Sequence, residues 1–376
     1  MSGQIDKERS EAFAERLLDT FNAGATAIMI SIGHRTGLFD AMHDRAPSTT
    51  DEIAAAAGLN ERYVREWLGA MLAGGVIECD EKGERFSLPP EHAAWLTRDA
   101  TPNNMAVYAQ YIPLFGTVED QIVECFHKGG GLPYTAYKRF HEVMAEDSGQ
   151  TVLPVLFDTI LPLVPGLVDR LEAGIDVLDV GCGSGRALNL MAAAYPNSRF
   201  VGYDLSEEGI RLARDEACRR GLTNVRFEQQ DLTSFAFPSQ YDLITAFDAI
   251  HDQARPDKVL AAIAGAMKPD GVFLMQDIAA SSRVHENRRH PVGPLLYTIS
   301  CLHCMSVSLA QNGMGLGTMW GEHKAREMLE AAGFKHVEIK RLPHDVMNYY
   351  LLARKQPLAA DAEPCAPKGT IAAAGA

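Results

Sequence analysis

From Ile175 to Lys355 the sequence alternates short apolar segments with longer amphipathic ones, and this alternation limits the fold more than any other feature. Apolar runs of about four to eight residues between turn residues predict strands, and helical spacing in the intervening segments predicts helices. Strands that alternate with helices form a mostly parallel sheet covered on both faces. The predicted strands are 176–180, 199–205, 225–232, 241–250, 271–278, 336–342 and 347–353.

The last two predicted strands are separated by residues 343–346 alone. A crossover between parallel strands needs about a dozen residues or more, so these two strands should pair antiparallel. The predicted fold class is therefore α/β, with a Rossmann-like sheet of seven strands that ends in an antiparallel C-terminal hairpin.

The N-terminal part of the chain has a different pattern, which is typical of a winged helix. Residues Thr49 to Glu52 resemble a capping box, the turn 58–60 follows, and a second helix is predicted over 61–73. Two short strands then flank the charged turn 80–84, as the strands of a wing do. We therefore predict a helical winged-helix domain within residues 1–98.

Charge argues against nucleic acid as a partner of this domain. The chain has a net charge of -14, which repels phosphate backbones. On the second helix, Arg62 and Arg65 are offset by Glu61 and Glu66, and the wing is also acidic. We interpret the domain as a dimerisation or substrate-covering module, with DNA binding as the less favoured alternative.

The helix predicted over residues 11–32 favours dimerisation. Its apolar side chains recur at helical spacing and form one face that has no obvious partner in its own module. They are Phe13, Leu17, Leu18, Phe21 and Ile28. A second copy of the chain would cover this face, so we expect a homodimer.

The remaining division of the chain follows from composition. Residues 99–170 are predicted to form a helical connector and lid, although domain packing also explains the aromatic residues at 134–140. Residues 356–376, rich in Ala, Pro and Gly, are predicted to be disordered. No apolar run approaches the roughly 20 residues that span a bilayer, the N-terminus is polar, and the seven cysteines are scattered. These features predict a cytoplasmic protein without membrane contact.

A glycine-rich turn follows the first strand of the sheet region. Val177–Val180 leads directly into Gly181-Cys182-Gly183-Ser184-Gly185. Glycines at such a turn let a ligand approach the backbone, and the following helix offers unpaired N–H groups. A dinucleotide fingerprint requires glycine or alanine at position 186, where Arg186 stands, and this argues against NAD and FAD.

The turn, the acid Asp179 before it, and the acid Asp204 at the end of the second strand together resemble class I methyltransferases that depend on S-adenosylmethionine (SAM). The resemblance covers Ile175 to Lys355 and implies a SAM-binding domain over 171–355. In this family Gly181, Gly183 and Gly185 would pack against the methionine part of SAM. Asp204 would accept hydrogen bonds from the ribose hydroxyls; its alternative role is to cap the helix predicted at 207–219.

The same resemblance implies further cofactor residues. The family places an acid after the third strand near the adenine amino group, and Asp231 stands there. Leu205 and Leu232 would enclose the adenine ring, although core packing also explains them. Phe247, at the end of the fourth strand, completes the expected cofactor-binding set.

The segment Phe247 to Asp252 follows the fourth strand, at the sheet edge where open α/β folds bind ligands. Together with the winged helix and the later segment 317–322, its His-Asp pair resembles small-molecule O-methyltransferases and uncharacterised bacterial methyltransferases. The resemblance implies that His251 deprotonates an acceptor hydroxyl. The sequence departs from that pattern at Gln253, where an aromatic residue often stands, and it does not reveal the second carboxylate that orients the histidine. The alternative is that His251 only packs at the start of a helix.

The insertion 285–321 is rich in Met, Cys, His and aromatic residues, which suit a pocket for a hydrophobic small molecule. Cys301, His303 and Cys304 lack the spacing of a zinc site, so no metal is expected. The predicted function is methyl transfer from SAM to a small hydrophobic acceptor, with oxygen favoured as the nucleophile over nitrogen, sulfur or carbon. The alternatives are a ligand-binding winged-helix regulator and a methyltransferase fold that performs other chemistry.

Overall fold

The computed structural model describes residues 5–233, 240–343 and 345–357. The chain divides into two compact units, which are described separately. Unit 1 comprises 1–161 and 295–312, and unit 2 comprises 162–294 and 313–376. Of the tail predicted to be disordered at 356–376, residues 358–376 lie outside the described residues.

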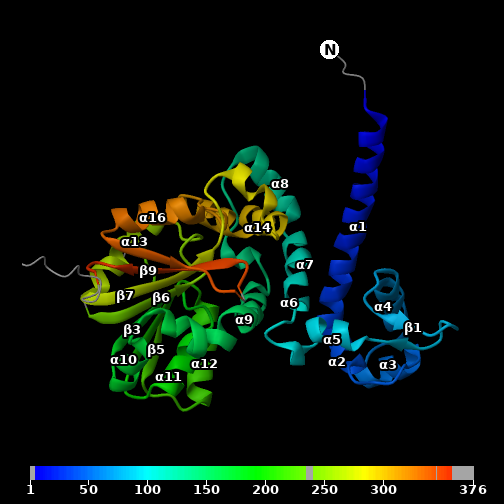
Figure 1. Cartoon of the computed structure of the whole chain (residues 1–376), viewed down its shortest axis with the longest axis horizontal. Coiled ribbons are helices and arrows are strands. Elements are labelled where there is room, and N and C mark those ends of the chain that lie inside the picture. Colours follow the sequence, from blue (N-terminus) through cyan, green and yellow to red (C-terminus); the bar gives the residue numbers. More distant parts are fainter. Residues whose placement is uncertain (1–4, 234–239, 344, 358–376) are drawn as a thin grey trace, which may run out of the picture. The chain divides into compact units, whose positions relative to one another are not determined.

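Unit 1 begins with the long helix α1 (Lys7–Thr36), and a winged helix follows it (Figure 1). The winged helix consists of α2 (Leu38–Met42), α3 (Thr50–Ala57), α4 (Glu61–Ala73), β1 (Glu78–Cys79), β2 (Phe86–Ser87) and α5 (Pro90–Leu96). The predicted capping box is present, since the Glu52 N–H donates to Thr49 Oγ1 at 3.3 Å and the Thr49 N–H donates to Glu52 Oε2 at 2.8 Å. The strands β1 and β2 pair antiparallel as the wing. The winged-helix prediction is confirmed.

Trp67 on α4 forms the centre of the winged-helix core. Its indole N–H donates to the Met29 carbonyl of α1 at 2.9 Å, and its ring contacts Phe39 edge-on with centroids 5.2 Å apart. A Cβ atom at position 33 would lie only 2.6 Å from the Trp67 ring. Helices α1 and α4 therefore pack this closely because residue 33 is glycine.

The rest of unit 1 is a helical layer with its own core. Its helices are α6 (Ala106–Ala109), α7 (Tyr111–Gly116), α8 (Glu119–Lys128), α9 (Phe140–Thr151) and α15 (Met305–Ala310), with a π-helical turn at Ser300–Cys304. Tyr111, Phe115 and Phe140 are buried in this core together with Val307 from the later segment of the unit. Helix α14 (Gly293–Ile299) begins at the boundary of the units.

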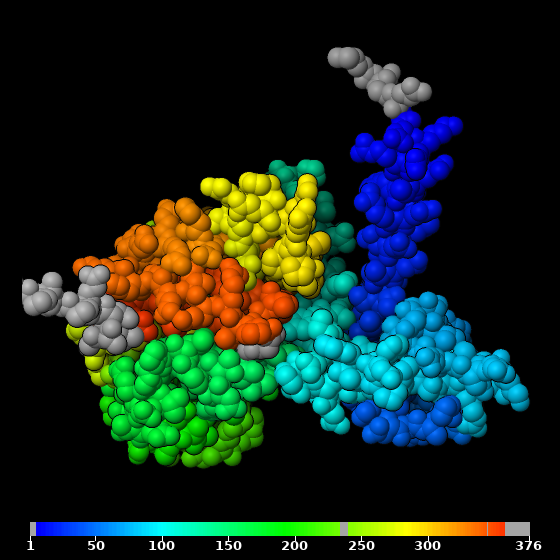
Figure 2. All heavy atoms as spheres, viewed as in Figure 1, coloured from blue at the N-terminus to red at the C-terminus, as the bar shows by residue number. Residues whose placement is uncertain are grey.

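The N-terminal half of α1 is exposed along its whole circumference in unit 1, since every residue from 5 to 23 is exposed. In Figure 2 this half of the helix, in blue, stands clear of the other atoms of its unit. Large apolar side chains lie on it: Phe13 is 53%, Leu18 63% and Phe21 65% exposed.

Unit 2 contains a seven-stranded sheet with the strand order β5-β4-β3-β6-β7-β9-β8. The strands are β3 (Asp176–Val180), β4 (Arg199–Asp204), β5 (Val225–Gln229), β6 (Tyr241–Phe247), β7 (Met267–Ile278), β8 (His336–Lys340) and β9 (Asn348–Arg354). The first five in this list pair in parallel, whereas β9 is antiparallel to both β7 and β8. The predicted α/β sheet with an antiparallel C-terminal hairpin is confirmed.

Helices cover both faces of this sheet (Figure 1). They are α10 (Leu167–Ala173), α11 (Arg186–Ala194) and α12 (Glu207–Arg219) on one face, and α13 (Pro256–Ala266) and α16 (Gly321–Ala331) on the other. A core cluster of the unit packs side chains of α13 and α16, such as Leu260 and Leu329, against Phe273 and Tyr349 of the sheet.

Several strands end earlier than the sequence pattern predicted. Leu205, Leu232 and Ile250 were expected to lie in strands, but β4, β5 and β6 end at 204, 229 and 247. The apolar pattern continues past each strand because these residues belong to the loops at the carboxyl edge of the sheet. The hydrogen bonds between neighbouring strands stop where those loops begin.

One helical stretch among the described residues, Gly293–Ala310, is long and apolar enough to cross a membrane, and 44% of it is buried. A buried core helix satisfies the same criterion of length and composition.

Candidate functional site

The turn between β3 and α11 carries three glycines with left-handed backbone, at φ values of 72° for Gly181, 52° for Gly183 and 67° for Gly185. A Cβ at Gly181 would lie 2.4 Å from Ala249 Cβ, and one at Gly185 would lie 2.6 Å from Ala213 Cβ. At Gly183 no atom lies within 4 Å of the Cβ position. Two glycines therefore allow close packing, and the middle one leaves backbone open to a ligand.

Asp204 ends β4 beside this turn and is half-buried. The Gly183 N–H donates to its Oδ2 at 2.8 Å, and the Ser206 N–H donates to its Oδ1 at 2.8 Å. The alternative role of Asp204 as the cap of the next helix is wrong. Ser206 caps α12, since its hydroxyl accepts from the Gly209 N–H at 3.1 Å. The carboxylate is thus coupled to the glycine turn.

Asp179, the other acid of the turn, is buried in β3 and accepts a hydrogen bond from the Thr245 hydroxyl at 2.7 Å. Burial raises the pKa of Asp179 to about 7, although the Thr245 hydrogen bond lowers it, and the nearby negative charge of Asp204 raises it further. Because the pKa of this buried carboxyl lies near neutral pH, a positive charge placed beside the turn would lower that pKa and favour the ionised form.

The other predicted cofactor residues occupy three different environments. Asp231 is exposed after β5, and its Oδ1 accepts from the Thr233 N–H at 2.9 Å and from the Thr233 hydroxyl at 2.6 Å. Leu205 is 47% exposed beyond β4, whereas Leu232 is buried in the core cluster of unit 2. Phe247 is half-buried at the end of β6. For Leu232, core packing is therefore part of its role.

His251 lies in the loop after β6 and is only 2% exposed. Its Nδ1 lies 2.9 Å from Asp277 Oδ1 and 3.7 Å from Asp248 Oδ1. Since a carboxylate accepts, Nδ1 carries the hydrogen, and the lone pair is on Nε2. The close contact of Ala249 with Gly181 joins this loop to the glycine turn.

Asp277 is the carboxylate that sequence reasoning did not place. It lies near the end of β7 and is fully buried. Its Oδ1 accepts hydrogen bonds from His251, from the Ile278 N–H at 2.8 Å and from the Trp320 indole N–H at 3.0 Å. A signal was available, because Asp277 is the penultimate residue of the predicted strand 271–278, which follows the predicted strand before His251, and parallel strands end at the same edge.

The ligand atoms of Asp248, His251 and Asp277 lie within 4.8 Å of one another, a spacing that could hold a metal ion. The other set considered from sequence lies in unit 1. There His303 is buried against aromatic rings, stacked on Phe140 with centroids 3.6 Å apart and edge-on to Tyr137 at 4.7 Å. These aromatic residues are part of the core of unit 1.

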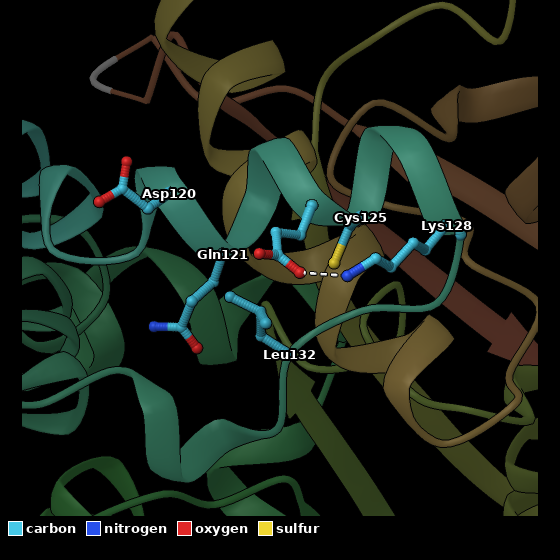
Figure 3. A pocket seen from close by; sticks show the side chains of 7 residues that line it. Asp120, Gln121, Cys125, Lys128 and Leu132 are labelled. Atoms are coloured by element: carbon cyan, nitrogen blue, oxygen red, sulfur yellow. Dashed lines mark hydrogen bonds and ion pairs between the residues drawn. The ribbon is translucent and has the colours of Figure 1, made fainter.

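Unit 1 also has a hollow along α8, with a cavity volume of about 360 Å³ (Figure 3). Its lining residues are Asp120, Gln121, Glu124, Cys125, Lys128, Gly129 and Leu132. An ion pair between Lys128 Nζ and Glu124 at 2.5 Å lies on its wall. None of the residues predicted to bind the cofactor or to react lines this hollow.

Two family models match the chain. Residues 24–98 match an Rv2258c-like winged HTH domain, and residues 171–338 match a methyltransferase domain. The nocamycin O-methyltransferase of Saccharothrix syringae is 30% identical over 198 residues, which cover 49% of this chain and 68% of that protein. The fatty-acid O-methyltransferase of Mycolicibacterium smegmatis is 30% identical over 105 residues, which cover 28% of this chain and 37% of that protein. A Synechococcus protein is matched over 24% of its length, so the chain spans well under two thirds of some of these relatives.

Solved structures share the fold over nearly the whole chain. The mitomycin 7-O-methyltransferase MmcR has a TM-score of 0.68 at 19% identity, covering 93% of this chain and 100% of that one. Human N-acetylserotonin methyltransferase, solved with SAM, has a TM-score of 0.64 at 17% identity, covering 95% and 100%. At such identities the likeness shows the fold, and the family follows from the sequence matches. The chain belongs to the SAM-dependent methyltransferase family and carries an N-terminal winged-helix domain.

Proposed function

We propose that the chain transfers a methyl group from SAM to a hydroxyl oxygen of a small hydrophobic acceptor. The observation that carries this proposal is the buried His251–Asp277 pair, on a loop whose Ala249 packs against the glycine turn. The nocamycin and fatty-acid relatives are both named as O-methyltransferases. A base is needed for a neutral hydroxyl, which is a weak nucleophile.

The residues at the turn fit the proposed cofactor. Gly183 is the glycine with open space at its Cβ position, and its N–H holds Asp204 toward the turn. A carboxylate there suits the vicinal hydroxyls of a ribose. Asp231 would bind the adenine amino group, with Leu205 and Phe247 beside the ring and Leu232 supporting it from the core. When bound, SAM supplies an electrophilic methyl group on a positively charged sulfur.

The residues of the chain then do three things. Asp277 holds the imidazole of His251 by accepting its Nδ1 hydrogen. Nε2 of His251 accepts the proton of the acceptor hydroxyl as the oxygen attacks, so the imidazole becomes positively charged. The carboxylates of Asp277 and Asp248 stabilise that charge, because both lie within 4 Å of Nδ1.

A metal ion held by Asp248, His251 and Asp277 is the competing use of this site. The hydrogen bonds of Asp277 and His251 favour a general base at His251 over a metal ligand. Asp277 Oδ1 already accepts from two N–H groups besides His251, and Nδ1 must be deprotonated to bind a metal through that nitrogen. Metal-free protein should therefore retain its activity.

A winged-helix regulator that binds DNA is the competing function of unit 1. On α4, Arg62 pairs with Glu66 at 2.5 Å and Arg65 pairs with Glu61 at 2.6 Å. Arginines paired with glutamates on the same helix are poorly suited to phosphate contacts. The domain is better suited to joining protomers.

The exposed apolar face of α1 leads to the prediction of a homodimer. Light scattering of the full chain should give a mass near twice 41.0 kDa. Replacing Leu18 and Phe21 together with glutamate should shift the mass toward that of one chain, because charges would enter the apolar face. Ala12→Glu, on the opposite side of the helix, should leave the dimer intact. A monomeric wild-type protein at micromolar concentration would contradict the proposal.

Loss of the Asp204 carboxylate should weaken SAM binding. We expect Asp204→Ala to lower the affinity about ten- to a hundredfold, because a charge-assisted hydrogen bond contributes roughly 1.5 to 3 kcal/mol. Titration calorimetry measures this directly. Asp215→Ala serves as the control, since Asp215 lies on the exposed surface of α12 and pairs with Arg211. Equal SAM affinities of the wild type, Asp204→Ala and Asp215→Ala would show that Asp204 does not bind the ribose.

The pKa of Asp179 predicts how affinity depends on pH. A positively charged ligand favours the ionised carboxyl, so below the pKa of about 7 binding must first release a proton. Affinity for SAM should therefore fall as the pH drops from about 7.5 to about 5.5, by at most tenfold per pH unit. Asp179→Asn should bind more weakly at pH 7.5 but show a flat profile. A variant that keeps the slope of the wild type would assign the ionisation to another group.

His251→Ala should leave the affinity for SAM nearly unchanged and lower the turnover number about 10²- to 10⁴-fold, the usual range for a general base. Turnover is measured as S-adenosylhomocysteine formed with a hydroxyl acceptor found by screening. The wild-type rate should rise with pH through one ionisation, and His251→Ala should lack that rise. His336→Ala, an exposed histidine of β8, is the matched control. Near-normal turnover of His251→Ala with an unchanged pH profile would show that another group takes the proton.

A further inference from the structure

We propose that Trp320 is a positioning residue that fixes the Asp277 carboxylate and, through it, the imidazole of His251. This inference rests on the proposed role of His251 as base and deepens it. The Trp320 indole N–H donates to Asp277 Oδ1 at 3.0 Å, and the same oxygen accepts from His251 Nδ1 at 2.9 Å. Trp320 is only 4% exposed, and its ring is part of the core of unit 2.

The hydrogen bonds on Asp277 are strongly asymmetric. Oδ1 accepts from His251, Trp320 and the Ile278 N–H, whereas Oδ2 is buried with no hydrogen-bond partner. The terminal torsion of an aspartate is soft, so an unsupported carboxylate could turn and offer His251 either oxygen at a varying angle. Donors from Trp320 and Ile278 hold Oδ1 toward the imidazole. The tautomer with its lone pair on Nε2 is thereby maintained.

The backbone next to Trp320 holds the indole in place. Gly321 has φ of 78°, and a Cβ there would lie 2.2 Å from the Ser282 nitrogen and 2.4 Å from the Ser281 carbonyl carbon. The Glu322 N–H donates to the Ala280 carbonyl at 3.0 Å, and the Lys324 N–H donates to Ser282 Oγ at 3.0 Å. The first turn of α16 is thus bound to the loop that follows β7. This fixes Trp320 beside the end of the strand that carries Asp277.

The indole also affects how tightly His251 holds a proton. An N–H donor without charge stabilises the carboxylate and takes up part of the acceptor capacity of Oδ1. Without the indole N–H, the Ile278 N–H still holds Oδ1 toward the imidazole, and that oxygen has one donor fewer. Asp277 would then stabilise the charged imidazole more strongly, and His251 would lose its proton at higher pH.

The other groups near His251 stay in place when only the indole N–H is removed. They are Asp248 in the same loop as His251 and Tyr349 on β9, which pairs with Asp277 in the sheet register. The pKa of Tyr349 is raised by burial and by the Asp277 charge. A change in the titration of His251 therefore reports on Trp320.

Trp320→Phe tests the proposal, because phenylalanine fills most of the space and lacks the N–H. Imidazole signals of histidine-labelled protein without ligand are followed by NMR over a pH titration, and the His251 signal is assigned by its loss in His251→Ala. We expect the midpoint of His251 to rise by about half to one pH unit in Trp320→Phe. Trp67→Phe, which removes a buried indole hydrogen bond in unit 1, should lower thermal stability and leave the midpoint unchanged.

Asp277→Asn shows whether the effect passes through the carboxylate. In the Asp277→Asn background, Trp320→Phe should no longer shift the midpoint. An equal shift with and without Asp277, or no shift in the single variant, would overturn the proposal. Because the readout is a titration and not turnover, a negative result here is distinct from a failure of His251 as base.

The wild-type protein offers a second measurement in case Trp320→Phe does not fold. The chain has three tryptophans, so its indole N–H signals are few and separable. The Trp320 signal should move with pH at the midpoint of His251, because both donors share Asp277 Oδ1. The signal of Trp95, which is 52% exposed, should not move at that midpoint. A Trp320 signal that ignores the His251 titration would contradict the coupling.

Discussion

The parallel pairing of β4, β3, β6 and β7 is the constraint on which the site depends. Parallel strands end at one edge of a sheet, so the loops after them must meet there. The register pairs Val180 with Tyr203 and Phe247 with Gln276, which sets Asp204 beside the glycine turn and Asp277 beside the loop of His251. The glycine turn and the loop of His251 meet at Gly181, because the Cβ of Ala249 occupies the space that a side chain at position 181 would need. A side chain at position 181 would clash with Ala249 in the loop that carries His251.

Negative charge is concentrated at this edge, and the chain stabilises each acid differently. Asp204 accepts from backbone N–H groups, and Asp277 accepts from a backbone, an indole and an imidazole N–H. Asp179 accepts only from the Thr245 hydroxyl among the hydrogen bonds described, and burial raises its pKa to about 7. A site of this kind favours a positively charged ligand and a reaction in which a histidine gains a proton.

Much of this architecture could be predicted from the sequence. The alternation of strands and helices, the short connection at 343–346 and the capping box at Thr49 are local signals, and each has the predicted structure. The resemblance to SAM-dependent methyltransferases identified the glycine turn and Asp204, and the structure brings them together through the Gly183 N–H. These features depend on residues close in sequence or on strand order.

The partners of His251 could not be found in the same way. Asp277 lies 26 residues away and Trp320 lies 43 residues beyond Asp277, so only the three-dimensional structure brings them together. Strand ends were also missed at Leu205, Leu232 and Ile250, because apolar patterning does not show where ladder pairing stops. The pKa of Asp179 likewise depends on burial by residues from several strands.

A structure of the protein determined with S-adenosylhomocysteine tests the central claim most directly. The account predicts ribose hydroxyls within hydrogen-bond distance of Asp204, the methionine part along the turn at Gly183, and the sulfur on the side of the site that holds His251. A ligand bound elsewhere, or no bound ligand at saturating concentration, would contradict it.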